Sequence, residues 1–214
     1  MSTDKKVRKK KQKAVILDFD DVIVDFCGGL CELYNKHNGT SLALSDLTEW
    51  NWRNLDFKDA RGNVVKGCDI QKLFSEYEHQ LYVGLEPLPY AVRALETIKM
   101  YGYKIFIITA RHCEVGKSTE LNLMFKKIPH DDIYHRESKD MKIEDFKVNK
   151  IKELSKKYNI SFFVDDKVET VNAVADSCKV NRVYLLNKPH NKEIEASEDI
   201  IRIDDLVETI RYLK

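Results

Sequence analysis

Two aspartates at the end of an apolar segment are the residues of this sequence best suited to chemistry. Asp18 and Asp20 directly follow the apolar run 14–17. Residues two apart in a strand point to the same side, so both carboxylates can enter one pocket at the edge of a sheet. Two neighbouring carboxylates repel each other unless a cation lies between them, and the pair therefore indicates a Mg²⁺ site. The alternative is a strand followed by the acidic residues of a solvated turn.

Complementary side chains follow two further strand-like runs, 104–108 and 160–164. The first run ends in a hydroxyl, a small residue and a guanidinium, and the second ends in two carboxylates (Thr109, Ala110, Arg111; Asp165, Asp166). Each run is short, apolar and flanked by helix-like segments, a pattern typical of a parallel sheet with crossover helices. Because the carboxyl ends of parallel strands meet at one edge, we expect these groups to share a pocket with the first two aspartates.

The remaining segments complete an alternating α/β chain. Helical spacing and boundary residues predict helices over 26–37, 69–82, 117–127 and 147–158, and further short strands over 132–134 and 182–186. Between the first two of these helices the sequence is irregular, apart from a helix start at 45–47. The irregular and helical piece between the first two strands is therefore expected to be an insertion.

In this order and spacing the motifs resemble those of the haloacid dehalogenase (HAD) superfamily of aspartate-nucleophile phosphatases. They read as a strand with DxDxV, a strand with Thr, a Lys, and a strand with DD, and they cover most of residues 14–187. The resemblance implies an α/β fold with a Rossmann-like parallel sheet and a small, mainly helical C1 cap. It divides the chain into a core of 14–26 and 87–214 and a cap of 27–86, preceded by a basic tail of 1–13.

The resemblance also implies roles for the clustered residues. Asp18 would attack phosphorus and form an aspartyl-phosphate, while Asp20 would protonate the leaving oxygen and then accept a proton from the hydrolytic water. Thr109 and the backbone N–H of Ala110 would bind phosphoryl oxygens. Arg111 would either bind phosphate or pair with an acidic neighbour.

The expected metal site uses the same aspartates. Asp18, Asp165, Asp166 and the backbone carbonyl of Asp20 would bind Mg²⁺, an ion that prefers a few carboxylates together with waters and substrate phosphate. Asp21 departs from the family, which commonly has Gly at this position. Its carboxylate would weaken phosphate binding unless it turned outward.

Two lysines, Lys147 and Lys150, lie one turn apart at the start of the helix predicted before the DD strand. Either could neutralise a phosphoryl oxygen. Family members with a short helix here place the lysine in its opening turn, just ahead of an apolar residue such as Ile151. We therefore expect Lys150 to be the catalytic lysine and Lys147 to be a second phosphate contact.

Substrate class is suggested by residues 18–26, DFDDVIVDF, which resemble the opening motif of the 5'(3')-deoxyribonucleotidases. Trp50, Trp52 and Phe57 in the insertion could stack on a nucleobase, or they could form the apolar core of the cap. The expected function is Mg²⁺-dependent hydrolysis of a nucleoside monophosphate. The alternatives are a nucleic-acid end-processing phosphatase resembling 3'-phosphatases, which a closed cap would hinder, and a catalytically degenerate protein that binds a phosphorylated ligand.

Composition agrees with a globular enzyme acting on a small phosphorylated substrate. The chain of 214 residues is 43% hydrophobic and 33% charged, and no apolar run approaches the ~20 residues of a membrane span. Its five cysteines lack a CxxC spacing, which favours a reducing, cytoplasmic location. Seven Lys and Arg residues fall within 1–13. Such a tail is expected to be solvated, or to attract nucleic acid weakly.

Overall fold

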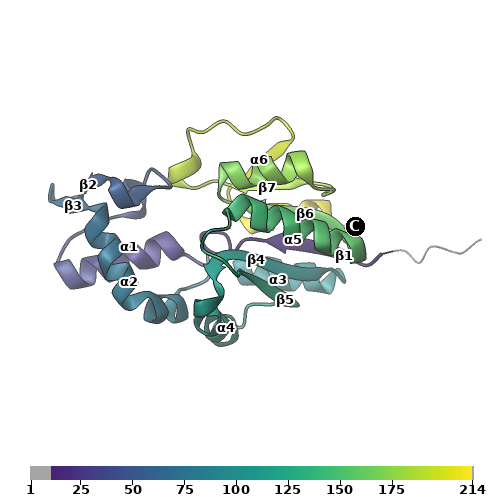
Figure 1. The fold of residues 1–214 in the computed structure, drawn as a ribbon, viewed down its shortest axis with the longest axis horizontal. Coiled ribbons are helices and arrows are strands. Elements are labelled where there is room, and N and C mark those ends of the chain that lie inside the picture. The colour runs from purple at the N-terminus through teal and green to yellow at the C-terminus, as the bar shows by residue number, and fades with distance from the viewer. Residues whose placement is uncertain (1–10, 214) are drawn as a thin grey trace, which may run out of the picture.

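A computed structural model describes residues 11–213 of the chain, and its central element is one six-stranded, wholly parallel sheet (Figure 1). The strand order is β5-β4-β1-β6-β7-β8. The strands are β1 (Lys13–Leu17), β4 (Lys104–His112), β5 (Asp132–Arg136), β6 (Asn159–Asp165), β7 (Val183–Leu186) and β8 (Ile200–Ile203). The apolar run 14–17 lies at the centre of the sheet because β1 pairs with β4 on one side and with β6 on the other.

Helices cover both faces of the sheet, which explains the nearly continuous apolar sequences of its strands. Val15 and Leu17 belong to the cluster shared with α3 (Ala91–Met100), while Ala14 and Ile16 pack with α5 (Ile143–Lys157) and α6 (Val168–Ser177). The 3₁₀ helix η5 (Leu206–Tyr212) packs beside α3, and α4 (Gly116–Phe125) lies near the cap. Two-sided burial of β1 thereby fixes the direction in which its carboxyl end points.

Residues 27–86, which we call the cap, form a separate group of elements at one end of the sheet (Figure 1, left). The group is built on helices α1 (Phe26–Asn38) and α2 (Gly67–Gly84), which pack together. The short 3₁₀ helices η1 (Leu44–Asp46) and η2 (Trp52–Asn54) and the antiparallel hairpin of β2 (Asp56–Lys58) and β3 (Val64–Lys66) complete it. An isolated antiparallel bridge between Val24 and Pro87 joins its two connections to the core.

Several predicted boundaries differ from the structure. The helix predicted from residue 147 begins at Ile143. The β2–β3 hairpin and β8 were not predicted. Lys13 belongs to β1 and not to a tail, whereas residues 1–10 of the predicted tail lie outside the described residues. Within residues 11–213, every helix is too short or too polar to cross a bilayer.

Candidate active site

A buried lysine joins the ends of the two central strands. Lys147 Nζ lies 2.8 Å from Oδ1 of Asp18 and 2.7 Å from Oδ2 of Asp165. Asp18 follows β1 and Asp165 ends β6, and the N–H of Asp18 donates to the carbonyl of Val164. All three charged side chains are buried, and both carboxylates raise the pKa of Lys147 despite its burial. The ammonium group is therefore held charged between the two carboxylates.

The expectation that Lys150 reaches this pocket is wrong. Helix α5 begins four residues earlier than predicted, so Lys147 lies in its second turn and faces the pocket. Lys150 instead pairs with Glu153 at 2.7 Å, its Nζ lies 4.8 Å from the ring centroid of Tyr134, and it does not line the cavity into which Asp18 opens. The residue given second place by sequence, Lys147, is the one beside the predicted nucleophile.

Three buried carboxylates could bind a divalent cation. Oxygen atoms of Asp18, Asp165 and Asp166 all lie within 4.8 Å of one another. Burial, together with the neighbouring carboxylates, raises the pKa values of Asp18 and Asp165, although Lys147 opposes the shift. Oδ1 of Asp166 has no hydrogen-bond partner within residues 11–213. A buried set of like charges with an unpaired oxygen fits a hard cation such as Mg²⁺.

The loop between β7 and β8 supplies two contacts to Asp166 that the sequence did not reveal. His190 Nε2 lies 3.0 Å from Oδ2 of Asp166. The side-chain amide of Asn191 donates to the backbone carbonyls of Asp166, at 2.7 Å, and Leu186, at 2.8 Å. The two residues thus fix both the carboxylate and the backbone of Asp166. They belong to no motif, and no local sequence signal marks them.

Asp20 and Arg111 form a two-point ion pair at the mouth of the same site. Arg111 Nε donates to Oδ2 of Asp20 at 2.9 Å, and Nη2 donates to Oδ1 at 2.5 Å. Of the two roles weighed for Arg111, the structure shows the pairing with an acidic neighbour. Thr109 is fully buried, and its Oγ1 accepts the backbone N–H of Arg111 at 3.2 Å, while Ala110 lines the adjoining cavity.

Asp21 turns inward instead of outward. Its φ of 55° is in the left-handed region that usually favours glycine, the residue expected at this position from the resemblance. The side chain is buried, and its Oδ1 accepts the N–H of Cys27 at 3.0 Å. Burial raises the pKa of Asp21 to about 7, with the nearby Asp166 adding to the shift. The departure from the family pattern therefore adds a buried carboxyl group beside the predicted metal ligands.

A cavity of about 510 Å³ lies between the cap and the strand ends. Asp18, Asp20, Ala110 and Arg111 line it from the core. Phe26 and several cap residues also line it (Trp50, Trp52, Arg53, Phe74, Tyr82), and further cationic or imidazole groups face it from the core (His112, Arg136, Lys139, His190). The predicted nucleophile thus opens into a space large enough for a small-molecule ligand.

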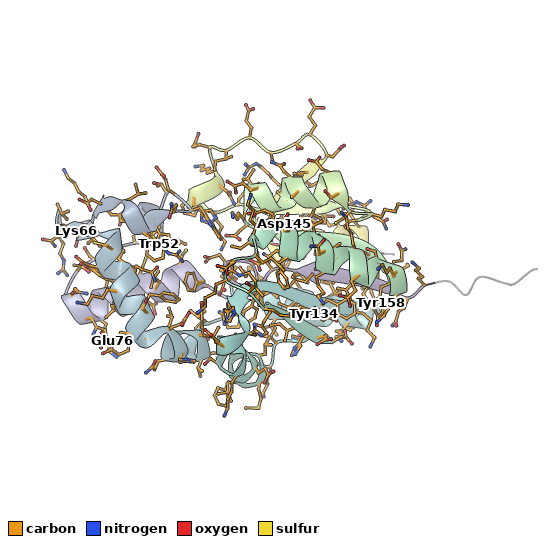
Figure 2. The ribbon with its side chains drawn as sticks, viewed as in Figure 1. Trp52, Lys66, Glu76, Tyr134, Asp145 and Tyr158 are labelled. Atoms are coloured by element: carbon orange, nitrogen blue, oxygen red, sulfur yellow. The ribbon has the colours of Figure 1, made fainter. Side chains whose placement is uncertain are left out.

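The three cap aromatics proposed for base stacking have different surroundings. Trp50 lines the cavity and is 41% exposed, whereas Trp52, which also lines it, is only 7% exposed. Trp52 lies within the cap, while Lys66 and Glu76 extend outward from the same region (Figure 2). Phe57 is buried in the apolar cluster that the cap shares with the core and does not line the cavity. Trp50 is therefore the aromatic ring most accessible to a ligand, and Phe57 contributes to the cap core.

Comparison with solved structures shows the HAD-like fold. The chain matches a haloacid dehalogenase-like hydrolase of Streptococcus pneumoniae with a TM-score of 0.63 and 13% identity, covering 95% of this chain and 99% of that one. It also matches the D,D-heptose 1.7-bisphosphate phosphatase of B. bronchiseptica, solved with magnesium and phosphate, with a TM-score of 0.52, 10% identity and coverage of 94% and 97%. A chain of the Pnkp1/Rnl/Hen1 RNA repair complex matches with a TM-score of 0.51 and 17% identity over 83% of this chain, which spans only 43% of that chain.

Sequence comparison identifies the enzyme family. A Bacillus cereus protein named "Putative nucleotidase" is 26% identical over 179 residues, which are 83% of this chain and 87% of that protein. The family model described as "5' nucleotidase, deoxy (Pyrimidine), cytosolic type C protein" matches residues 12–211, nearly the whole chain. The protein is accordingly a phosphomonoester hydrolase of the HAD superfamily, and it belongs to the family of the cytosolic type C 5' nucleotidases.

Proposed function

We propose that the protein hydrolyses a nucleoside monophosphate through an aspartyl-phosphate formed on Asp18, with Mg²⁺ as its cofactor. The observation that carries the proposal is the position of Asp18. Its carboxylate contacts the buried ammonium of Lys147, lies within the three-carboxylate cluster, and opens into the cavity beneath the cap. A nucleophilic carboxylate can attack a phosphate dianion only where positive charge cancels their repulsion.

The chain's own residues supply the other groups of the reaction. Asp18 attacks phosphorus while Asp20 protonates the departing oxygen, and Asp20 then accepts a proton from the water that hydrolyses the intermediate. The hydroxyl of Thr109 and the N–H of Ala110 bind phosphoryl oxygens, and Lys147 neutralises charge. Lys150, which pairs with Glu153, takes no part.

Asp18, Asp165 and Asp166 would hold the metal, with the backbone carbonyl of Asp20 as a further ligand. When bound, Mg²⁺ supplies charge neutralisation for the carboxylates and the phosphate. The structurally similar heptose bisphosphate phosphatase was solved with magnesium and phosphate, which supports this choice of ion.

The substrate assignment rests on the cap. We propose that residues 27–86 close over the substrate and that Trp50, with Trp52 behind it, contacts the base. The family description supports a nucleotide, and a covered cavity of about 510 Å³ favours a small molecule over a nucleic-acid strand. The word "cytosolic" in that description and the five free cysteines support a cytoplasmic location.

A phosphate-release screen tests this function. The wild type is assayed with Mg²⁺ against ribo- and deoxyribonucleoside 5'- and 3'-monophosphates, sugar phosphates and a 3'-phosphorylated oligonucleotide. We expect turnover of at least one nucleoside monophosphate, a loss of several orders of magnitude in Asp18→Asn, and no turnover of the oligonucleotide. Preferred turnover of the oligonucleotide, or activity of Asp18→Asn within tenfold of wild type, would contradict the proposal.

A further inference from the structure

We propose that Arg111 is a positioning residue that aims the proposed general acid, Asp20, and that the cap holds Arg111 in place through Tyr82. The inference rests on the proposed function, because it assigns a partner to the acid of that reaction. Asp20 has one side chain and two tasks, and both require its carboxyl group at a defined point beside the leaving oxygen. The structure contains a fork-shaped group that fixes such a point.

The contact between Arg111 and Asp20 restrains the orientation of the carboxylate. Two different nitrogens of one planar guanidinium donate to the two oxygens of one carboxylate, at 2.9 and 2.5 Å. A bidentate pair of this kind fixes both the position and the plane of the carboxylate, which a lysine ammonium cannot do. Arg111 is only 3% exposed, so water competes little for the same hydrogen bonds.

The other sides of the guanidinium are also occupied by protein. Nη1 donates to Oγ1 of Thr119 in α4 at 3.1 Å. The Cζ atom lies 4.6 Å from the ring centroid of Phe19 and 3.7 Å from that of Tyr82, within the range of cation–π contacts. Each of the three guanidinium nitrogens of Arg111 therefore donates to a protein acceptor, and aromatic rings lie close to its central carbon. These contacts leave little of the group free to bind phosphate.

These contacts connect the acid to the cap. Tyr82 lies near the end of α2, in the cap, whereas Arg111 is in the core strand β4. The end of α2 is itself fixed, because the side-chain amide of Asn122 in α4 donates to the carbonyls of Val83, at 3.0 Å, and Leu85, at 2.8 Å. The position of α2 therefore determines where the ring of Tyr82 lies against Arg111. Through Arg111, it also determines the orientation of the Asp20 carboxylate.

The ion pair between Arg111 and Asp20 corresponds to the state of Asp20 after it has donated its proton. As the bond between phosphorus and the leaving oxygen breaks, the proton of the Asp20 carboxyl passes to that oxygen and the alcohol departs. The carboxylate left on Asp20 is then held by Arg111. The water that attacks the aspartyl-phosphate gives its proton back to this carboxylate, which restores the acid and releases phosphate.

Substrates whose leaving groups differ in acidity can show whether Arg111 positions Asp20 or has another role. The substrates are substituted phenyl phosphates from phenyl phosphate to p-nitrophenyl phosphate, assayed with Mg²⁺ in the full-length protein. A poor leaving group needs the acid, whereas p-nitrophenolate leaves almost unaided. For Arg111→Met we expect a loss of kcat/KM of ~10²-fold on phenyl phosphate and less than tenfold on p-nitrophenyl phosphate, so the plot against leaving-group acidity steepens.

Four further variants sharpen the test. Arg111→Lys keeps the charge but loses the fork, and should also steepen the plot; if Arg111→Met does not fold, as judged by circular dichroism, Arg111→Lys decides. Tyr82→Leu should steepen it and Tyr82→Phe should not, because only the first removes the ring. Arg182→Met is the matched control, since Arg182 stacks on Tyr212 at 4.6 Å and does not line the cavity. Its plot should parallel that of the wild type.

Two results would overturn the inference. An equal loss of kcat/KM on every substrate in the Arg111 variants would indicate a role in phosphate binding or folding. A role in phosphate binding would also weaken inhibition by inorganic phosphate. We expect instead that the inhibition constant of phosphate changes less than threefold. An unchanged plot would remove Arg111 from the acid step. Both results leave wild-type hydrolysis and its dependence on Asp18 intact, so they differ from failure of the proposed function, in which the wild type hydrolyses none of the nucleoside monophosphates.

Discussion

The indole of Trp50 packs edge-on against the imidazole of His190, with ring centroids 5.2 Å apart and ring planes inclined by 68°. The first residue belongs to the cap and the second to the loop after β7. Because His190 Nε2 also lies 3.0 Å from Oδ2 of Asp166, the exposed cap aromatic is two contacts away from a predicted metal ligand. Lys167 Nζ lies 5.4 Å from the same indole ring. The cap side of the cavity and the predicted metal ligands are therefore connected through side chains in direct contact.

Replacing Trp50 with Leu should reduce activity on nucleotides selectively. Stacking of a base on an aromatic ring is worth ~1–3 kcal/mol, so kcat/KM on a nucleoside monophosphate should fall about 5- to 150-fold. On p-nitrophenyl phosphate, which has no base, it should stay within threefold of wild type. Equal losses on both substrates would assign Trp50 to docking of the cap and not to base recognition.

Trp52 should respond differently to the same substitution. It is 7% exposed and packs inside the cap, so Trp52→Leu removes buried ring volume. Large-to-small changes of this kind cost ~1–4 kcal/mol and lower the melting temperature by several degrees. Thermal unfolding followed by circular dichroism measures the effect. A melting temperature equal to that of Trp50→Leu would show that the two rings are equally dispensable to the cap.

Lys147→Met and Lys150→Met form a matched pair that tests the lysine assignment. Loss of Lys147 leaves Asp18 and Asp165 buried without their shared cation, so turnover should fall on the order of 10³-fold and stability by ~3–5 kcal/mol. Loss of Lys150 breaks its pair with Glu153, a contact worth less than ~1 kcal/mol, and its contact with the ring of Tyr134, and activity should remain near wild type. Kinetics and urea unfolding of both variants check this, and a larger kinetic defect in Lys150→Met would reverse the assignment.

Asp166→Asn should weaken metal binding while leaving the fold intact, because it removes one charge from the three-carboxylate cluster. Titration calorimetry with MgCl₂ should show a Kd at least tenfold higher than in the wild type, and EDTA should abolish wild-type hydrolysis. Asp176→Asn, an exposed position on α6, is the control and should bind Mg²⁺ as the wild type does. Full wild-type activity in EDTA would remove the metal from the mechanism.

Asp131 should make the folded protein sensitive to acid. Partial burial alone would raise its pKa, but hydrogen bonds from Lys104 at 2.7 Å, from Lys99 and from the N–H of Ile105 at 2.8 Å lower it to about 2. A lowered pKa in the folded state stabilises the protein above the ordinary Asp value of 3.8, and this stability is lost as the pH falls toward 2. Asp131→Asn should therefore cost about 2 kcal/mol at pH 7 and much less near pH 2. Urea unfolding at several pH values tests this, and an equal cost at both extremes would exclude the charge as its origin.

The parts of the site that the sequence could predict are those that end apolar strands. Asp18, Thr109 and Asp165 each follow a run that is buried on both faces, and parallel pairing then brings them to one edge. Their proximity needed no knowledge of distant contacts. The order of the strands in the sheet was not predicted, because it depends on packing that no single apolar run encodes.

The lysine was misassigned because the start of its helix carries no capping signal. The N-cap residue of α5 is Lys142, whose side chain makes no capping hydrogen bond. With no Ser, Thr, Asp or Asn to mark the boundary, the helix was predicted to begin at residue 147. An error of four residues in the predicted helix start is enough to place Lys150 in the opening turn, whereas α5 actually begins at Ile143.

Other features escaped prediction because they are short or depend on long-range contacts. Strands β2 and β3 have three residues each and β8 has four, too few to show alternation clearly. His190 reaches Asp166 from a loop 24 residues further along the chain. The bidentate contact of Arg111 with Asp20 spans 91 residues, and only the folded chain could decide between an ion pair and a phosphate contact.

The carboxylate cluster that prepares the site for an ion also couples the enzyme's folding to its ionic surroundings. Burial raises the pKa values of Asp18 and Asp165, so their negative charge is less stable in the folded protein than in the unfolded chain, where water surrounds it. An ion that binds only the folded form stabilises it by mass action, and each tenfold excess over its dissociation constant adds ~1.4 kcal/mol. The melting temperature of the protein should accordingly rise with magnesium concentration, in which case the proposed cation would stabilise the folded state as well as support catalysis.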